Sequence, residues 1–198
     1  MEHKGTKKLE TNRLILRRYM EADAEPMYRN WASDPEVVKY LTWPTHTSVE
    51  ITKSLLSDWI ARYKKPDYYN WVIALKETGE VIGNISVVEI REKVDAAVIG
   101  YCMGQAWWGK GIMAEALTEV MRYLFDEVGI NRVAACHDSN NLKSGRVMQK
   151  AGMKYEGTLR GAGRNNQGII DEVWYGLLKA DRETENINGI PHGRSNLR

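Results

Sequence analysis

The sequence predicts one domain of the α/β (α+β) class, with helices on both faces of a mostly antiparallel central sheet. Three observations predict this fold. A length of 198 residues is that of a single domain with a substantial core. The apolar pattern switches between the two-residue period of strands and the 3.6-residue period of helices. The elements do not alternate strand and helix throughout, as they would in a Rossmann fold.

The N-terminal half is predicted to form, in order, a strand at residues 13–19, helices at 23–31 and 49–63, and a hairpin of strands at 69–75 and 81–88. The first strand is read from RLILRRY, in which Leu14 and Leu16 fall on the same side of an extended chain. The segment 40–46 between the two helices contains Pro44, which predicts a loop. This loop either packs against the domain or forms a wall that faces a substrate. The turn of the hairpin contains Gly79.

The C-terminal half is predicted to form strands at 97–103 and 132–136 around a long helix after Gly111, then a helix at 142–150, then strands at 153–158 and 170–178 joined by a long turn at 161–168. The long helix shows three-four apolar spacing and stops at Gly129. Asn141 or its neighbours can cap the second helix, and Gly152 can end it. Residues 1–8 and 181–198 are expected to be flexible ends.

Composition excludes several classes of protein. A net charge of +2 gives no argument for a nucleic-acid partner. No apolar run approaches the ~20 residues of a membrane span, and MEHKGTKKLE lacks the core of a signal peptide. We therefore expect a cytoplasmic protein with no membrane partner. Cys102 and Cys136 lie in predicted strands without metal-ligand spacing, so we expect free buried thiols and no metal.

The segment 98–115, VIGYCMGQAWWGKGIMAE, carries the main functional signal. A strand gives way to a glycine loop, WWGKG, and the loop opens into the long amphipathic helix. The first turn of a helix has unpaired N–H groups at the positive end of its dipole, and glycines let a diphosphate approach that backbone. Lys110 adds a positive charge, so the loop predicts an anion site.

A nucleotide P-loop is one interpretation of this loop. The pattern Gly-x-x-x-x-Gly-Lys from Gly104 has the right spacing, but the next position, which must be Ser or Thr to hold Mg²⁺, is Gly111. Trp107 and Trp108 also stand where a P-loop needs small residues. The metal ligand of a P-loop is therefore missing. A strand-to-helix turn that binds nothing is a second alternative.

The loop and three further stretches resemble the GCN5-related N-acetyltransferase (GNAT) family. The family signature Gln/Arg-x-x-Gly-x-Gly/Ala is matched at residues 108–113, with the central Gly111 kept and other residues at the two ends. Residues 141–153, NLKSGRVMQKAGM, look like the family's Asn-x-x-Ala/Ser…Glu-Lys-x-Gly-Phe segment. The opening and closing strands are similar to the RimJ/RimL branch, named for ribosomal-protein N-terminal acetyltransferases. The resemblance covers residues 9–180, which it identifies as one N-acetyltransferase domain.

This resemblance implies a splayed sheet whose fourth and fifth predicted strands diverge, with acetyl-CoA in the gap. The pantetheine arm would bond to backbone near Tyr101, Cys102 and Met103, and Asn141 would also hold it. The implied diphosphate site consists of the amides of Trp108, Gly109, Lys110, Gly111, Ile112, Met113 and Ala114.

Ser144 is the predicted acid for the leaving thiolate and is counted among the cofactor-binding residues. Many family members place a Tyr seven residues after the Asn, but that position here is Met148, which cannot donate a proton. The resemblance to the RimJ/RimL branch points instead to the hydroxyl three residues after Asn141. The alternative for Ser144 is a first-turn serine that satisfies a local N–H.

The general base is left open by the sequence. RimJ/RimL enzymes can carry a glutamate in the hairpin before the last strand, but residues 160–168 contain no carboxylate. Glu89, Asp95, Glu156 and Asp171 lie nearby in the predicted order, but each is better explained as a solvated or salt-bridged carboxylate than as a base, and water can relay the proton.

The sequence thus predicts an acetyl-CoA-dependent N-acetyltransferase in which a primary amine attacks directly in a ternary complex. The acceptor is a protein N-terminus, as on a ribosomal protein, or a small-molecule amine. The alternative is a non-catalytic acyl-CoA sensor of the same fold, which the missing hairpin glutamate and Met148 suggest. Whether the chain is a monomer or a homodimer is open.

Overall fold

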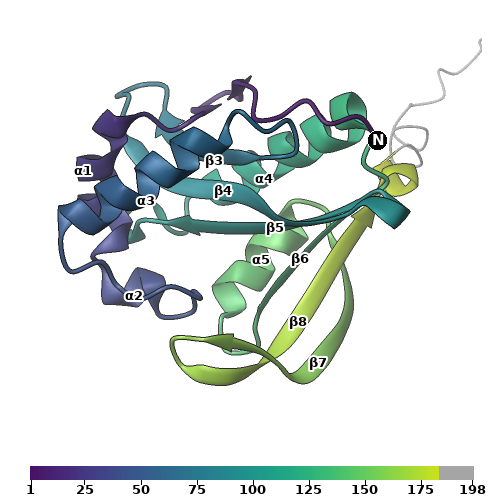
Figure 1. The fold of residues 1–198 in the computed structure, drawn as a ribbon. Coiled ribbons are helices and arrows are strands. Elements are labelled where there is room, and N and C mark those ends of the chain that lie inside the picture. Colours follow the sequence, from purple (N-terminus) through teal and green to yellow (C-terminus); the bar gives the residue numbers. More distant parts are fainter. Residues whose placement is uncertain (183–198) are drawn as a thin grey trace, which may run out of the picture.

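An eight-stranded sheet organises the chain, and a computed structural model describes residues 1–182 (Figure 1). The strands are β1 (Leu9–Glu10), β2 (Leu14–Arg17), β3 (Asn70–Leu75), β4 (Val81–Arg91), β5 (Ala96–Met103), β6 (Arg132–Asp138), β7 (Lys154–Asn165) and β8 (Gly168–Leu178). The helices are α1 (Ala24–Met27), α2 (Pro35–Val38), α3 (Val49–Arg62), α4 (Ile112–Tyr123) and α5 (Leu142–Lys150). Short 3₁₀ or π turns are η1 (Glu21–Asp23), η2 (Tyr28–Ala32), η3 (Glu92–Val94), η4 (Gln105–Trp107) and η5 (Leu124–Val128).

The strands lie in the order β1-β2-β3-β4-β5-β6-β8-β7. Every neighbouring pair is antiparallel except β5 with β6, which is parallel. The predicted α/β (α+β) class with a mostly antiparallel sheet is confirmed. In the described residues no helix has both the length and the apolar character needed to cross a bilayer.

Successive residues of the central strands face two separate cores, because strand side chains alternate between the faces of a sheet. In β3, Ile73 belongs to the core that includes Leu117 of α4, whereas Val72 belongs to the core that includes Leu56 of α3. Figure 1 shows α3 on the near side of the sheet and α4 on the far side. Helices therefore cover both faces, as predicted.

The sheet splits between β5 and β6. These strands pair over three residues only, from Ala96 with Arg132 to Val98 with Ala134. Beyond that point β5 continues to Met103 against β4, and β6 continues to Asp138 against β8. Figure 1 shows the two strands diverging from this junction. The predicted splay is confirmed, and in the described part of the chain each strand has one edge without a strand partner beyond the junction.

Helix α5 has the predicted bounds, but three features differ from the prediction. Strand β1 and helix α2, of two and four residues, were not predicted because such short elements show no periodicity. The long turn expected at residues 161–168 is wrong, since β7 runs to Asn165 and β8 begins at Gly168. Gly161, at φ +60°, lies in a register shift that lets the hairpin continue.

Residues 1–8, expected to be a flexible end, have defined contacts in the structure. The Glu2 amide donates to the Val128 carbonyl (2.8 Å), and the hydroxyl of the buried Thr6 donates to the Tyr68 carbonyl (2.9 Å). The Tyr123 hydroxyl donates to the Gly5 carbonyl (2.7 Å). Of the predicted C-terminal tail, residues 183–198 lie outside the described part of the chain.

Candidate active site

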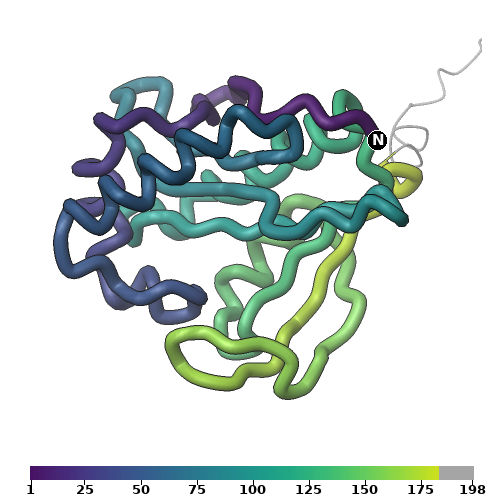
Figure 2. The backbone as a smooth tube through the Cα atoms, in the orientation of Figure 1, coloured from purple at the N-terminus to yellow at the C-terminus, as the bar shows by residue number. Residues whose placement is uncertain are grey.

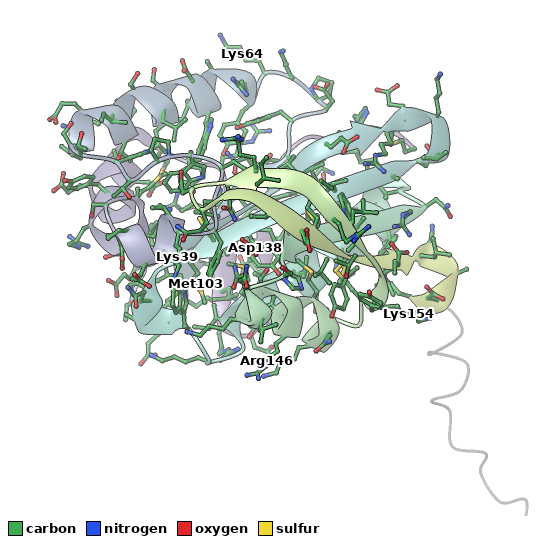
Figure 3. All side chains as sticks on the ribbon, turned by 90° about the horizontal axis from the view of Figure 1, so that it is seen from below. Lys39, Lys64, Met103, Asp138, Arg146 and Lys154 are labelled. Carbon is green, nitrogen blue, oxygen red and sulfur yellow. The ribbon has the colours of Figure 1, made fainter. Side chains whose placement is uncertain are left out.

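A cavity of about 420 Å³ lies between the end of β5 and the start of α5, at the splayed end of the sheet. Its walls come from the end of β5, the loop into α4, the start of α5, and the segment at and after α2. The lining residues are Glu36, Val37, Lys39, Tyr40, Leu41, Tyr101, Cys102, Met103, Trp108, Gly109, Met113, Asn140, Asn141, Leu142, Lys143, Ser144 and Val147. Figure 3 views this end of the sheet from below, with Met103, Lys39 and Asp138 labelled.

The loop between β5 and α4 turns on two glycines in the left-handed conformation. Their φ angles are +76° at Gly109 and +73° at Gly111, which residues with a Cβ adopt only with strain. The first backbone bond of the helix runs from the Glu115 amide to the Gly111 carbonyl (3.1 Å). Within the described residues, the amides of Ile112, Met113 and Ala114 therefore have no helical acceptor. This loop is able to bind an anion.

The predicted cofactor residues fall into two groups. Those that line the cavity are Tyr101, Cys102, Met103, Trp108, Gly109, Met113, Asn141 and Ser144. The others, Lys110, Gly111, Ile112 and Ala114, do not line it. The side chains of Ile112 and Ala114 are buried, so these two residues present only backbone N–H groups. The Lys110 side chain is exposed.

Trp108 stands where the family signature has Gln or Arg, and its indole joins the loop to the sheet. The indole Nε1 donates to the Met103 carbonyl at the end of β5 (2.7 Å). The Lys143 Nζ lies 4.5 Å from the centre of the Trp108 ring, a cation–π distance. This contact places a positive charge from α5 beside the glycine loop.

Ser144 contacts the side chain of a different element rather than a local N–H. Its Oγ lies 2.9 Å from the Tyr101 hydroxyl, and that hydroxyl also donates to the Ser144 carbonyl (3.0 Å). Because a carbonyl only accepts, the Ser144 hydroxyl is left as the donor between the two oxygens. Burial raises the pKa of Tyr101 well above its usual value, so the phenol stays neutral. The Tyr101 side chain is a site group that the sequence did not indicate.

Asn141 is the N-cap of α5, as predicted. Its Oδ1 accepts from the Ser144 amide (3.4 Å). Its Nδ2 has no partner within the described residues, and Asn141 lines the cavity. This N–H₂ group is therefore available to a ligand in the gap.

The four carboxylates considered as bases are engaged outside the cavity, as expected of solvated or salt-bridged groups. Glu89 is paired with Arg91 (2.8 Å) and Glu156 with Arg132. Asp95 binds the α-ammonium group of the first residue (3.1 Å), and Asp171 accepts from the Gly161 amide (2.8 Å). Among the described residues, the carboxylate that lines the cavity is that of Glu36, which sequence reasoning missed.

Both cysteines are free and half-buried. Burial raises the pKa of the Cys102 thiol to about 12 and that of the Cys136 thiol to about 11. Both thiols are thus protonated at neutral pH and are poor nucleophiles. Residues 1–182 contain no group of three or more His, Cys, Asp or Glu side chains placed to hold a metal ion.

The tip of the β7–β8 hairpin meets the segment that follows α2. The Asn166 Nδ2 donates to the carbonyls of Val38 (2.9 Å) and Trp43 (2.8 Å), and its backbone amide donates to Leu41 (3.1 Å). Figure 2 shows the two segments side by side. Since Leu41 lines the cavity, this contact fixes one cavity wall. Of segment 40–46, Tyr40 and Leu41 line the cavity.

Helix α2, which carries part of this wall, has a start signal in the sequence. Asp34 is the N-cap, and its side chain accepts from the Glu36 amide (2.9 Å). Pro35 occupies the first helical position, where a missing N–H does no harm. The Asp-Pro pair before apolar residues is therefore the sequence signal from which helix α2 could have been predicted.

Comparisons with known proteins agree with this geometry. A family model described as an acetyltransferase (GNAT) domain matches residues 13–154. An uncharacterized N-acetyltransferase, YoaA of Bacillus subtilis, is 32% identical over 171 residues, covering 86% of this chain and 96% of the relative. The [ribosomal protein uS5]-alanine N-acetyltransferase of Escherichia coli is 30% identical over 159 residues, covering 76% of this chain and 79% of the relative.

A solved structure with the same fold is that of RimL, a ribosomal L7/L12 α-N-protein acetyltransferase in complex with coenzyme A. The TM-score is 0.76 at 22% identity, covering 87% of this chain and 98% of that one. The family model spans more than half of this chain, and relatives at 30% identity or more match most of it. The chain therefore belongs to the GCN5-related N-acetyltransferase (GNAT) family.

Proposed function

We propose that this chain transfers the acetyl group of acetyl-CoA to a primary amine by direct attack of the amine in a ternary complex. As a GNAT-family member with N-acetyltransferase relatives, it is an acetyl-CoA-dependent acetyltransferase. The observation that carries the finer proposal is the cavity between the end of β5 and the start of α5. It has unpaired amides at one end and the Ser144 hydroxyl on its wall.

The walls of this cavity fit acetyl-CoA. Pantetheine contains two amides, and within residues 1–182 the edge of β5 beyond Val98 has no strand partner on its β6 side. A diphosphate needs N–H donors and a positive potential, and the start of α4 supplies both beside Lys110 and Lys143. When bound, acetyl-CoA supplies the acetyl group as a thioester.

Direct attack is supported by the state of the two thiols. A route through an acetylated cysteine needs a thiolate, and burial keeps Cys102 and Cys136 protonated at neutral pH. In direct transfer the amine nitrogen bonds to the acyl carbon, the C–S bond breaks, the nitrogen loses one proton, and the leaving thiolate takes one. Ser144 can donate that proton by turning its O–H from the Tyr101 oxygen to the leaving sulfur. Backbone N–H groups at the β5 edge that faces the cavity are suited to donate to the thioester oxygen as it becomes negatively charged.

For the acceptor we propose the α-amine of a protein N-terminus, with a small-molecule amine as the alternative. The relative named for acetylation of an alanine of ribosomal protein uS5 supports the first class. Glu36, an exposed carboxylate among the residues that line the cavity, suits a cationic amine and can accept its proton.

A thiol-release assay with acetyl-CoA tests this proposal. The acceptors are peptides with a free N-terminus, the same peptides with a blocked N-terminus as matched controls, and a panel of polyamines, amino sugars and amino acids. We expect thiol release with free N-termini only. A protein that binds acetyl-CoA but releases no thiol with any acceptor would contradict the proposal.

Calorimetry with ATP provides a second check. Because Gly111 has no hydroxyl to hold Mg²⁺, we expect any ATP affinity to be the same with and without Mg²⁺, and coenzyme A to displace ATP. Tight binding that requires Mg²⁺ would favour the P-loop interpretation instead.

Replacing Asn166 with alanine tests the cavity wall. The change removes two side-chain hydrogen bonds, one to the last residue of α2 and one to the segment after it, so we expect a loss of about 1 kcal/mol of stability. We also expect the KM of the acceptor to rise by about 3-fold to 10-fold, as for a loss of roughly 1 kcal/mol in binding. The affinity for acetyl-CoA should stay unchanged.

The matched control is Gln167→Ala, because Gln167 is exposed beside Asn166 and no side-chain hydrogen bond ties it to the wall. Acceptor kinetics and thermal unfolding are measured on both variants. An unchanged acceptor KM in Asn166→Ala would show that this wall does not contact the acceptor.

A further inference from the structure

Arg13 and Glu115 join the start of β2 to the back of the glycine loop, although 102 residues separate them. Arg13 Nε and Nη2 both contact Glu115 Oε2 (2.6 Å each), and the Arg13 amide donates to Oε1 (3.1 Å). The remaining nitrogen, Nη1, donates to the Lys110 carbonyl (3.0 Å). One guanidinium therefore holds a helix carboxylate and a loop carbonyl at once.

The bond to Lys110 sets the direction of a neighbouring amide. A trans peptide is planar, and its C=O and N–H point in opposite directions. With the Lys110 carbonyl held on Arg13, the N–H of Gly111 in the same peptide points away from Arg13. A Cβ built on Gly111 would lie 3.8 Å from Arg13 Nη2, which places the guanidinium directly behind the loop. Arg13 thus turns one N–H of the anion site outward.

The bond to Glu115 removes a repulsion. Glu115 lies in the first turn of α4, where a free carboxylate would repel an anion bound at the same helix end. Burial acts to raise its pKa, but hydrogen bonds from Thr11 and Arg13 outweigh burial and lower it, so the carboxylate is charged. Pairing with Arg13 neutralises that charge locally, and Thr11 also donates to it.

We propose that Arg13 is a positioning residue for the diphosphate of acetyl-CoA: it orients the Lys110–Gly111 peptide and neutralises Glu115 behind the loop. This inference rests on the proposed function, which places the diphosphate on that loop. Arg13 itself stays on the far side of the loop from the ligand. Its effect therefore reaches the diphosphate through the backbone.

Calorimetry with coenzyme A and with pantetheine, which lacks the diphosphate, separates an effect of Arg13 on the diphosphate site from an effect on the rest of the cofactor site. Arg13 is 48% exposed, so solvent screening limits the effect. We expect Arg13→Gln to weaken the binding of coenzyme A by about 2-fold to 5-fold and to leave the binding of pantetheine unchanged. Arg13→Lys should behave like Arg13→Gln, because one ammonium cannot hold both Glu115 and the Lys110 carbonyl.

The matched control is Arg91→Gln, which breaks a similar two-bond pair with Glu89 at 50% exposure, away from the cavity. Arg91→Gln should leave the affinities for both coenzyme A and pantetheine unchanged. Full rescue by Arg13→Lys would overturn the positioning role in favour of bulk charge. Equal weakening of coenzyme A and pantetheine by Arg13→Gln would overturn it in favour of a general structural role, as would no weakening at all. If the unmodified protein binds coenzyme A no tighter than pantetheine, the diphosphate site itself is wrong.

Discussion

Replacing Gly109 with valine is expected to weaken acetyl-CoA binding by about 10-fold or more. Gly109 lines the cavity at the glycine loop, and a Cβ built on it meets no protein atom within 4 Å. The protein itself therefore has room for a side chain there. If the diphosphate lies on the amides that follow, a valine would occupy space that the ligand needs. Calorimetry with acetyl-CoA measures the loss directly.

Backbone strain is the competing cause, and Gly79 controls for it. Gly79 lies in the β3–β4 turn at φ +72°, close to the +76° of Gly109, and its Cβ would also meet nothing within 4 Å. Valine at either position should lower stability by a similar ~1–2 kcal/mol, the strain of a left-handed residue with a Cβ. Only Gly109→Val should lose affinity for acetyl-CoA. Equal affinities in the two variants would remove the loop from the cofactor site.

Gly111 gives a less direct test, although the family signature centres on it. Its Cβ would point toward Arg13 rather than into the cavity. A valine at Gly111 would therefore act by shifting the N-cap of α4 and its amides, not by direct collision with the ligand. The signature glycine, Gly111, is the residue at which the chain turns into α4, whereas Gly109 is the residue that lines the cavity.

The parts of the fold that the sequence predicted are those with local signals. Helix α5 has an Asn cap at one end and Gly152 after the other, and both bounds were predicted correctly. The helical pattern after Gly111 persisted through η5 to Gly129, which has φ +81°. In contrast, the four residues of α2 are too few for periodicity, and the glycines of residues 161–168 suggested a loop where the hairpin continues.

The candidate site divides in the same way. The cofactor loop and Ser144 lie within continuous motifs, so local sequence indicated them. Asn166 meets Val38 across 128 residues, and Arg13 meets Glu115 across 102 residues. Such contacts depend on how the sheet closes, and no local pattern records them. The Tyr101 hydroxyl was missed for a related reason, because its role depends on α5 packing beside β5.

Ser144→Ala is expected to lower turnover by roughly 10-fold to 100-fold and to leave acetyl-CoA affinity within a factor of a few. General acid catalysis is typically worth ~10² to 10⁴ in rate, and a thiolate, with a thiol pKa near ~8.5, needs less help than most leaving groups. The helix cap should survive, because Asn141 caps the Ser144 amide rather than the hydroxyl. Stability should therefore change little, and a loss confined to turnover marks an interaction made in the transition state.

Tyr101→Phe completes the test, because it keeps the ring and removes the oxygen that holds Ser144. We expect a smaller loss of turnover, about 3-fold to 10-fold, since the serine hydroxyl remains but is less well oriented. In the double variant the two losses should not add, because both act through one proton donor. Single-turnover rates, acetyl-CoA affinity and thermal unfolding are measured on all three proteins. Full turnover in Ser144→Ala would remove Ser144 from the mechanism and leave the thiolate to take its proton from solvent, whereas additive losses would assign Tyr101 a separate role.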